Sequence, residues 1–293
     1  MKNILLVSHV FPREVDDFDN LVTQLKTASS FLQGDLIFDY HIILNLNPEI
    51  IDWNKSNIPQ DFFVDKIKSS VKKLDWCNEI KLEILTDNGV FGLLEQRINL
   101  TKKFPDYFGY LIVDNDIILD DFYLYAFENS ITAINQTSDF VLIPQPYCHW
   151  DNSWDVISHV PFQNGFSTDE FNPYSIKSIK SGDDIELIDL REFKFAGGWM
   201  TFITRELLSK VLFPPVKGYG MEDTYLSLVF NKMKREGSPI HQYLMKNIVV
   251  QENRKYLSNS IYSNFVYYNI DLLKKINDES KQIFSNEIFK LKL

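Results

Sequence analysis

The chain has 293 residues, 45% of them hydrophobic and 14% aromatic, so it can bury a sizeable core as one large domain or two fused lobes. Its formal net charge of −10 argues against unselective attraction to nucleic acid or to an anionic membrane. No apolar run is long enough for a signal-peptide core or a membrane span, and Cys77 and Cys148 form neither a metal-binding pair nor a disulfide framework. These features predict a cytoplasmic protein.

The first 113 residues alternate between strand patterns and helix patterns. Short apolar runs rich in β-branched and aromatic side chains predict strands over residues 3–11, 40–46, 81–86 and 107–113. Apolar residues at helical spacing predict helices over 16–31 and 91–104, with a further helix within 50–76. This alternation favours an α/β layer of parallel strands, in which ligands gather at the carboxyl ends of the strands.

After residue 121 the pattern loosens. A helix over 122–134 and a strand over 140–143 are followed by an irregular stretch, 144–184, rich in aromatic, histidine, asparagine and proline residues. Such a long segment is usually functional or mobile, and its aromatic rings suit the flat faces of sugars, although they could equally cover the core. The last segment, 270–293, has the pattern of an amphipathic helix that caps the core, with a peripheral membrane contact or a partner helix as alternatives.

The most informative feature is the end of the fourth predicted strand, where a hydrophobic run stops abruptly at Asp114-Asn115-Asp116. Alternate side chains of an extended chain share a face, so the two aspartates can converge. Two carboxylates at one strand end repel each other unless a cation such as Mg²⁺ or Mn²⁺ lies between them. A cation held there could bridge the oxygens of a diphosphate and neutralise a leaving group. Solvated loop acids are the competing interpretation.

At this point the sequence resembles the GT-A glycosyltransferases, whose Asp-x-Asp metal motif occupies the same place in the chain. The resemblance implies a Rossmann-like, mostly parallel sheet flanked by helices, with acceptor-side loops and a C-terminal helix. It divides the chain into a nucleotide-sugar-binding half over 1–120, an acceptor-binding half over 121–262 and the helix over 263–293. It also implies a nucleoside diphosphate sugar as donor, with UDP as the expected nucleotide, and Mn²⁺ or Mg²⁺ on Asp114 and Asp116.

Further donor-binding residues are expected on both sides of this motif. In the family a helix carrying Arg or Asn precedes the metal strand, and Arg97 could pair with phosphate or base oxygens through its planar fork. Ser8 and Asn45, in the first two predicted strands, are assigned to the donor as well. Gly198 and Trp199 follow the paired glycines of Phe195-Ala196-Gly197-Gly198, a segment similar to one that lines the donor sugar in GT-A enzymes. The competing interpretations are that Arg97 is an ordinary surface residue and that the paired glycines form a plain turn.

The acceptor side is predicted from Gly218-Tyr219-Gly220-Met221-Glu222-Asp223, where glycines before an apolar run put two acids at a helix N-terminus. Helix capping alone could explain one of them. By its resemblance to the Glu-Asp motif of GT-A enzymes, Asp223 is the expected catalytic base and Glu222 orients it.

The third metal ligand is where the chain departs from the family pattern. Many GT-A enzymes have a late metal-binding histidine after a strand, and here that place reads Val250-Gln251-Glu252. Gln251 is therefore assigned as a ligand, with Glu252 or water as alternatives, and His241 is a less well placed candidate. His149 and His159 flank an aromatic segment and are candidates for acceptor or diphosphate binding, although lone histidines are more often structural.

The predicted function is metal-dependent transfer of a sugar to a hydroxyl acceptor, with a glycan as the expected acceptor. A glycosyltransferase acting on hydroxymethylated phage DNA is an alternative, for which Lys66, Lys68, Lys72, Lys73 and Lys81 could form a basic patch or merely solvate a helix. A haloacid-dehalogenase-type phosphatase is another, but Ile118 stands where that fold has a hydroxyl residue. A nucleotidyltransferase lacks its glycine-rich, basic phosphate loop here, and a non-catalytic carbohydrate-binding protein is the last alternative.

Overall fold

The apolar run at the amino terminus forms the central strand of the fold. The computed structural model describes residues 1–46, 58–86, 93–134, 138–147, 186–190, 200–211 and 222–253, together with Asp278 and Gln282. Strand β1, Lys2–Val10, sends Ile4 and Leu6 into one hydrophobic core and Leu5 and Val7 into a second. Both faces of β1 are therefore buried, which is why its sequence is continuously apolar rather than alternating.

Four parallel strands form one side of the sheet. β1 pairs with β2 (Leu36–Asn45) and with β4 (Gly109–Ile112), and β3 (Glu79–Leu85) pairs with the outer edge of β2. The carboxyl ends of β1, β2 and β4 consequently lie side by side. The structure confirms the predicted parallel α/β layer over this part of the chain.

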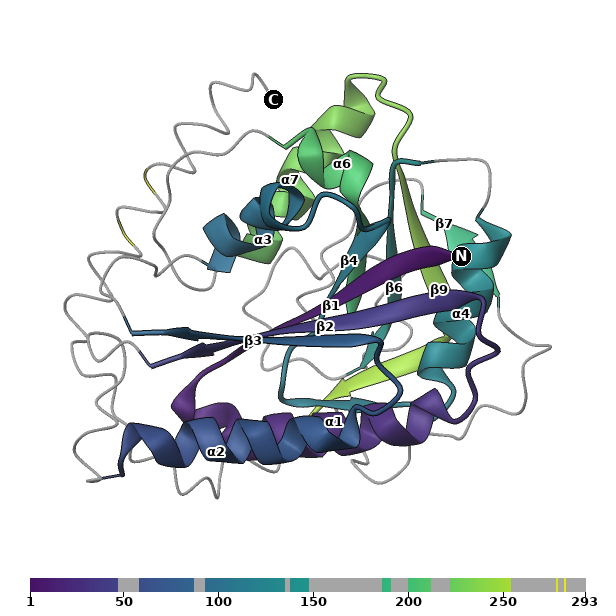
Figure 1. Ribbon diagram of the computed structural model, residues 1–293. Helices are drawn as coiled ribbons and strands as arrows, with labels where there is room; N and C mark the ends of the chain where they lie inside the picture. Colours follow the sequence, from purple (N-terminus) through teal and green to yellow (C-terminus); the bar gives the residue numbers. More distant parts are fainter. Residues whose placement is uncertain are drawn as a thin grey trace.

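The other side of the sheet is mixed. Its strands are β5 (Ile117–Leu119), β6 (Phe140–Tyr147), β7 (Leu187–Asp189), β8 (Thr201–Thr204) and β9 (His241–Glu252). β8 lies antiparallel between β4 and β6, β9 is parallel to β6, and β5 and β7 are antiparallel to β9. The strand order is β3-β2-β1-β4-β8-β6-β9-β5 (Figure 1). These pairings mean that β2, β3, β4, β6 and β9 run in the same direction as β1. The pairing of β4 with β8 joins the two predicted halves of the chain in one sheet.

Helices cover both faces of this sheet (Figure 1). One face packs against α1 (Val15–Ser29), α2 (Gln60–Ser70) and α4 (Tyr123–Ala133). The opposite face packs against α3 (Leu93–Lys103), α6 (Arg205–Ser209) and α7 (Glu222–Arg235). Each helix turns an apolar stripe to the sheet, as Phe18, Leu21 and Leu25 of α1 do with no exposed surface. The predicted flanking helices are thus confirmed.

Two strand boundaries differ clearly from the sequence prediction. β2 begins at Leu36 instead of residue 40, and β6 continues to Tyr147, four residues into the stretch predicted to be irregular. The predicted strand ended at Ile143, and its continuation contains Pro144 and Pro146. The pairing of β6 with β9 shifts register between Pro144 and Gln145, and proline is tolerated at such an irregularity.

Several sequence predictions fall on other parts of the chain. Residues 148–185, which make up most of the aromatic segment with His149 and His159, lie outside the described residues. The predicted C-terminal helix also lies outside them, apart from two isolated positions. Within the described ranges, no helix combines the length and the apolar character needed to cross a bilayer.

Candidate active site

The segment that follows β4 has a strict inside-outside alternation. Its odd-numbered residues are buried, with relative exposures of 2%, 5%, 1% and 6% for Val113, Asn115, Ile117 and Leu119. Asp114 and Asp116 are partly exposed. The chain bends at Asn115 and Asp116, so the alternation of an extended strand does not by itself put the two aspartates on one face. That they share a face stays a prediction. The pair lies beside the carboxyl end of β1, in the middle of the sheet.

The first half of this segment is anchored to the end of β1. The Ser8 hydroxyl donates to the carbonyl oxygen of Val113 at 3.1 Å, and Val113 donates its backbone N–H to Val7 at 2.9 Å. Asn115 Nδ2 donates to the carbonyl oxygen of His9 at 2.8 Å and to Glu14 Oε2 at 3.0 Å. The backbone of the Asp114–Asp116 turn is therefore held by contacts from residues more than 100 positions earlier in the chain.

The second half is anchored by α1 and β9. Gln24 of α1 donates to the carbonyl oxygen of Ile117 at 3.1 Å and accepts from the N–H of Leu119 at 2.8 Å. The Asn253 N–H donates to the carbonyl oxygen of Asp116 at 2.7 Å. Gln24 thus occupies the open edge of β5, and the carboxyl end of β9 is fixed beside Asp116.

Arg97 approaches Asp114 from the face of the sheet that α3 covers, opposite the face covered by α1. It belongs to α3, is 8% exposed, and its guanidinium lies 3.8 Å from Asp114 Oδ1. At this distance the attraction is Coulombic rather than a direct hydrogen bond. A buried guanidinium beside a partly exposed carboxylate marks the positively charged side of the site, where an anionic ligand would be favoured.

His9 and Asn45 complete the cluster at the ends of β1 and β2. Asn45 is 2% exposed, and its Nδ2 donates to His9 Nε2 at 3.3 Å. Burial of the imidazole, followed by the charges of Arg97 and His41, lowers the pKa of His9 to about 3. His9 is therefore neutral near pH 7, and its buried Nδ1 has no hydrogen-bond partner among the described residues.

Ser8 is turned away from this cluster. It has no exposed surface, and its hydroxyl pairs with Tyr40 Oη at 2.7 Å besides bonding Val113. Its contribution in the structure is to hold β1, β2 and the start of the aspartate turn together. Direct contact between Ser8 and a donor nucleotide stays a prediction.

The third metal ligand was expected near the end of β9. The backbone of Gln251 pairs with Ile118 and that of Glu252 with Ile117, so both residues lie in the strand next to Asp116, while their side chains are outside the described part. His241 is at the opposite end of the 12-residue strand, about 30 Å away at the rise of a β-strand. Its Nδ1 lies 2.8 Å from Asp189 Oδ2. The candidacy of His241 as a ligand of this metal is therefore wrong, because His241 is at the amino end of β9 and the carboxyl end of that strand lies beside Asp116.

Other predicted site residues are only partly described. α7 begins at Glu222, so the backbone of Glu222 and Asp223 opens a helix as predicted, but their side chains lie outside the described residues. Gly198 and Trp199 also lie outside them. The roles assigned to these four residues stay predictions.

The oxygen ligands available at the Asp114–Asp116 turn suit a hard divalent cation. Two partly exposed carboxylates one residue apart supply oxygen ligands of the kind that Mg²⁺ and Mn²⁺ favour, and would leave positions for water and phosphate oxygens. Within the part of the chain whose side chains are described, histidine, cysteine and acidic residues form no group of three or more that could hold a metal.

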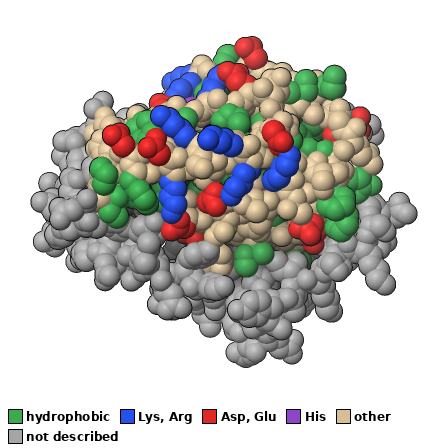
Figure 2. Space-filling view, turned by 60° about the horizontal axis from the view of Figure 1, so that its bottom comes forward, with side chains coloured by type: hydrophobic (Ala, Val, Ile, Leu, Met, Phe, Trp, Pro, Cys, Tyr) green, Lys and Arg blue, Asp and Glu red, His purple; other side chains and the backbone are tan. Residues whose placement is uncertain are grey.

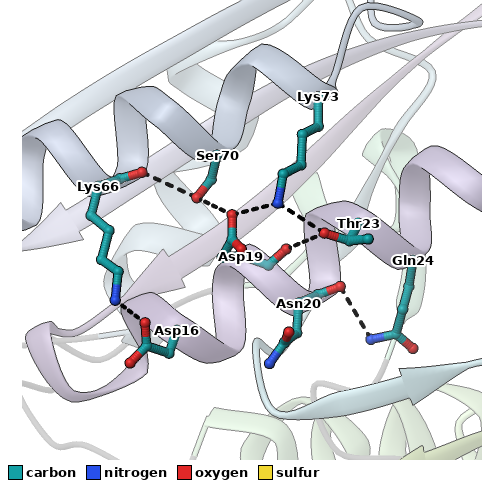
Figure 3. A network of polar contacts seen from close by, with 8 residues as sticks. All are labelled: Asp16, Asp19, Asn20, Thr23, Gln24, Lys66, Ser70 and Lys73. Carbon is teal, nitrogen blue, oxygen red and sulfur yellow. Dashed lines mark hydrogen bonds and ion pairs between the residues drawn. The ribbon is translucent and has the colours of Figure 1, made fainter.

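Three of the five lysines offered as a nucleic-acid patch form ion pairs with acidic residues, and Figure 3 shows two of these pairs. Lys66 pairs with Asp16, and Lys73 lies 2.7 Å from Asp19 Oδ1. Lys81, on strand β3, has its Nζ 3.3 Å from Glu79 Oε2 on the same strand. Figure 2 shows acidic and basic side chains interleaved over the face that includes α1 and α2. This arrangement favours the solvated helix face over the basic patch.

The sequence matches no family model and no curated protein. Among solved structures, S. aureus TarS 1-349 in complex with UDP-GlcNAc is similar at 12% identity and a TM-score of 0.49, covering 98% of this chain and 71% of that one. GalNAc-T7 with UDP, GalNAc and Mn²⁺ is similar at 10% identity and 0.48, covering 99% of this chain and 57% of that one. UDP-glucose pyrophosphorylase from Acinetobacter baumanii is similar at 10% and 0.46, with 98% and 99% covered.

This chain therefore spans little more than half of GalNAc-T7, and it spans 60% of another TarS 1-349 structure. At these identities and TM-scores the similarities carry no argument about activity. The case for a function depends instead on the residues at the ends of β1, β2 and β4.

Two residues of this cluster were missed from the sequence. His9 follows Ser8 in a strand and resembles any half-buried histidine, and Asn115 is the variable middle residue of Asp-x-Asp. The available signal was their place at strand ends, where ligands of α/β sheets gather. Neither the buried position of Asn115 nor the neutral state of His9 could be derived without their partners, which come from distant parts of the chain.

Proposed function

We propose that this chain is a metal-dependent glycosyltransferase that moves a sugar from a nucleoside diphosphate sugar to a hydroxyl acceptor. The observation that carries the proposal is the partly exposed pair Asp114 and Asp116 just after a parallel strand, with the buried guanidinium of Arg97 3.8 Å from Asp114. A bound divalent cation would supply charge neutralisation for a departing diphosphate. UDP is the nucleotide that we propose for the donor, from the resemblance of the Asp-x-Asp motif.

The chain's own residues would bind and orient the donor. Asp114 and Asp116 would hold the cation, with Gln251 as a further oxygen ligand from the neighbouring strand. Arg97 would attract the diphosphate through its buried positive charge. Asn45 and neutral His9 offer uncharged polar groups, which suit the base or ribose rather than the phosphates. Fixed groups of this kind stabilise developing charge without reorganising during the reaction.

The acceptor side is proposed from the start of α7. Asp223 would accept the proton of the attacking hydroxyl, and Glu222 would orient it or the acceptor. Gly198 and Trp199 would line the donor sugar. If Asp223 acts as the base, the product has inverted anomeric configuration; if Asp223 only binds the acceptor, retention is possible. A glycan is the acceptor that we propose, because the paired lysines of α2 and η3 (Val71–Lys73) give little support to a nucleic-acid acceptor.

The first test is metal-dependent stabilisation by nucleotide sugars. Binding stabilises the native state by about 2.7 kcal/mol at 100 times the Kd, which corresponds to about 5 °C in Tm for a chain of this size. We expect one UDP-sugar with MnCl₂ to raise the Tm by at least this amount. Asp116→Ala should abolish the metal-dependent part of the shift, while the matched control Asp121→Ala, at an exposed aspartate nearby, should keep it.

The second measurement is consumption of that donor with candidate acceptors. Release of free nucleotide together with a glycosylated product supports the transferase. A donor that binds but is never consumed favours the non-catalytic carbohydrate-binding role, and phosphate release from an aryl phosphate favours the phosphatase. An undiminished Tm shift in Asp116→Ala would contradict the proposed metal site.

A further inference from the structure

The middle residue of the Asp114-Asn115-Asp116 turn occupies a position that the alternation would give to an apolar side chain. Its inward-facing neighbours are Val113 and Ile117, and Asn115 itself is only 5% exposed. Burying an amide is costly unless it is hydrogen-bonded. Asn115 meets part of this cost with two bonds from Nδ2, to the His9 carbonyl oxygen and to Glu14 Oε2, while its buried Oδ1 has no hydrogen-bond partner among the described residues. The amide is therefore a specific link rather than a filler of space.

Glu14 is the other end of this link. It is the last residue of the short 3₁₀ helix η1 (Pro12–Glu14), which connects β1 to α1. Its Oε2 accepts from Asn115 Nδ2 at 3.0 Å and from the Phe11 N–H at 3.3 Å. One carboxylate oxygen thus ties the β1–α1 connection to the aspartate turn. Hydrogen bonds to an ionised carboxylate are roughly twice as strong as neutral ones.

The link bears directly on the two aspartates. Asp114 and Asp116 are like charges on either side of Asn115, and their repulsion would favour a turn in which they rotate apart. Asn115 and Asp116 form a bend, and fixing the side chain of Asn115 on the inner side restricts the backbone of that bend. The restricted bend limits how far the two carboxylates can separate before a cation arrives.

We propose that Asn115 and Glu14 form a positioning pair that holds the carboxylates of Asp114 and Asp116 in place for a divalent cation. This inference rests on the proposed function, since it assigns the cation to that turn. Neither residue is proposed to touch the cation or the donor. Outer partners that orient metal ligands typically change metal affinity by 10–100-fold, and this sets the expected size of the effect.

The experiment is direct titration of the full chain with Mn²⁺, followed by the EPR signal of the free ion, without donor or acceptor. We expect Asn115→Ala and Glu14→Ala each to raise the Mn²⁺ Kd by about tenfold or more. Glu14→Gln keeps a carbonyl oxygen at the same place and should restore binding to within about threefold of the unmodified chain. The double variant should bind no more weakly than either single one, because both remove the same link.

The matched control is Asn129→Ala, which removes a side-chain amide bonded to the Tyr125 carbonyl oxygen at 2.9 Å on α4, and it should leave the Kd unchanged. If Asn115→Ala does not fold, Glu14→Ala and Glu14→Gln test the link from the other side. Unchanged Mn²⁺ affinity in Asn115→Ala or Glu14→Ala, with affinity lost in Asp116→Ala, would overturn the positioning pair and leave the proposed function intact. Unchanged affinity in Asp116→Ala as well would remove the proposed function.

Discussion

At the scale of single residues, His41 is an ionisable group that the fold buries next to the candidate site. It is 2% exposed in β2, and its Nε2 lies 2.9 Å from Glu83 Oε2. Burial lowers the pKa of His41, and the charges of Lys103 and Lys81 act in the same direction against the opposing Glu83. Burial alone would raise the pKa of Glu83, but its hydrogen bond to Lys103 and the charges of Lys103 and His41 lower it overall.

Both shifts predict that acid destabilises the fold. The unfolded chain protonates His41 near pH 6.5 and Glu83 near pH 4.3, whereas the folded chain protonates each at a lower pH. Stability is therefore fully present above about pH 6.5 and falls below it, by up to about 1.4 kcal/mol per pH unit for each proton. We expect His41→Gln to flatten the dependence between about pH 6.5 and 5, measured by urea unfolding. Equal slopes in the two proteins would contradict this assignment.

At the scale of elements, one buried carboxylate joins a helix to the start of a strand. Glu128 of α4 is 1% exposed and accepts from the N–H groups of Gln33 and Asp35 at 2.6 Å and of Leu36 at 3.1 Å. Gln33 and Asp35 lie between α1 and β2, and Leu36 is the first residue of β2, opposite Lys2 of β1. Glu128 therefore supplies one buried acceptor for three backbone N–H groups, of which that of Leu36 is at a buried residue.

We expect Glu128→Ala to lower the free energy of unfolding by about 3 kcal/mol or more, because it leaves three backbone donors without their acceptor. Glu128→Gln keeps one carbonyl oxygen and should lose less. The control is Glu206→Ala on α6, an exposed residue paired with Arg205, where a surface ion pair contributes about 1 kcal/mol or less. Urea unfolding measures all three, and a loss below about 1 kcal/mol in Glu128→Ala would contradict the anchoring role.

At the scale of the whole molecule, charge is distributed so that opposite signs meet locally. Lys26 pairs with Asp75 at the end of α1, in addition to the two lysine pairs of α2 and η3 (Figure 3). Ser70 and Thr23 join the Lys73–Asp19 pair through hydrogen bonds at 2.7 and 3.0 Å. The face formed by α1 and α2 is therefore held by a polar network and presents no single sign of charge.

We expect no retention of duplex DNA, hydroxymethylated or not, in a mobility-shift assay at about 150 mM salt, since binding to phosphates requires unpaired cations. Replacing both Asp16 and Asp19 with Asn frees Lys66 and Lys73 and should increase retention at low salt. The net charge of −10 also disfavours DNA binding by the unmodified chain. Tight, salt-sensitive binding by the unmodified chain would instead favour the nucleic-acid acceptor.

Much of the fold was predictable because its signals are local. The first four strands and the helices α1, α3 and α4 follow from apolar periodicity, and the Asp-x-Asp turn stands out where a buried strand meets acidic residues. What periodicity does not contain is the partner of each strand. β8 has only four residues, Thr201–Thr204, so its place between β4 and β6 depends on pairing with strands distant in sequence. The continuation of β6 through two prolines depends on its irregular pairing with β9 in the same way.

The candidate site shows the same division between what the local sequence determines and what the tertiary structure decides. Residue type and spacing by themselves determined that two carboxylates end a buried strand and can share one face, because alternation along an extended chain is a local property. Only the tertiary structure decided that Asn115 is held by Glu14, that His9 is neutral beside Arg97, and that β9 brings Gln251 rather than His241 to Asp116. Each of these depends on burial and on partners about 90 or more residues away, which no local pattern in the sequence contains.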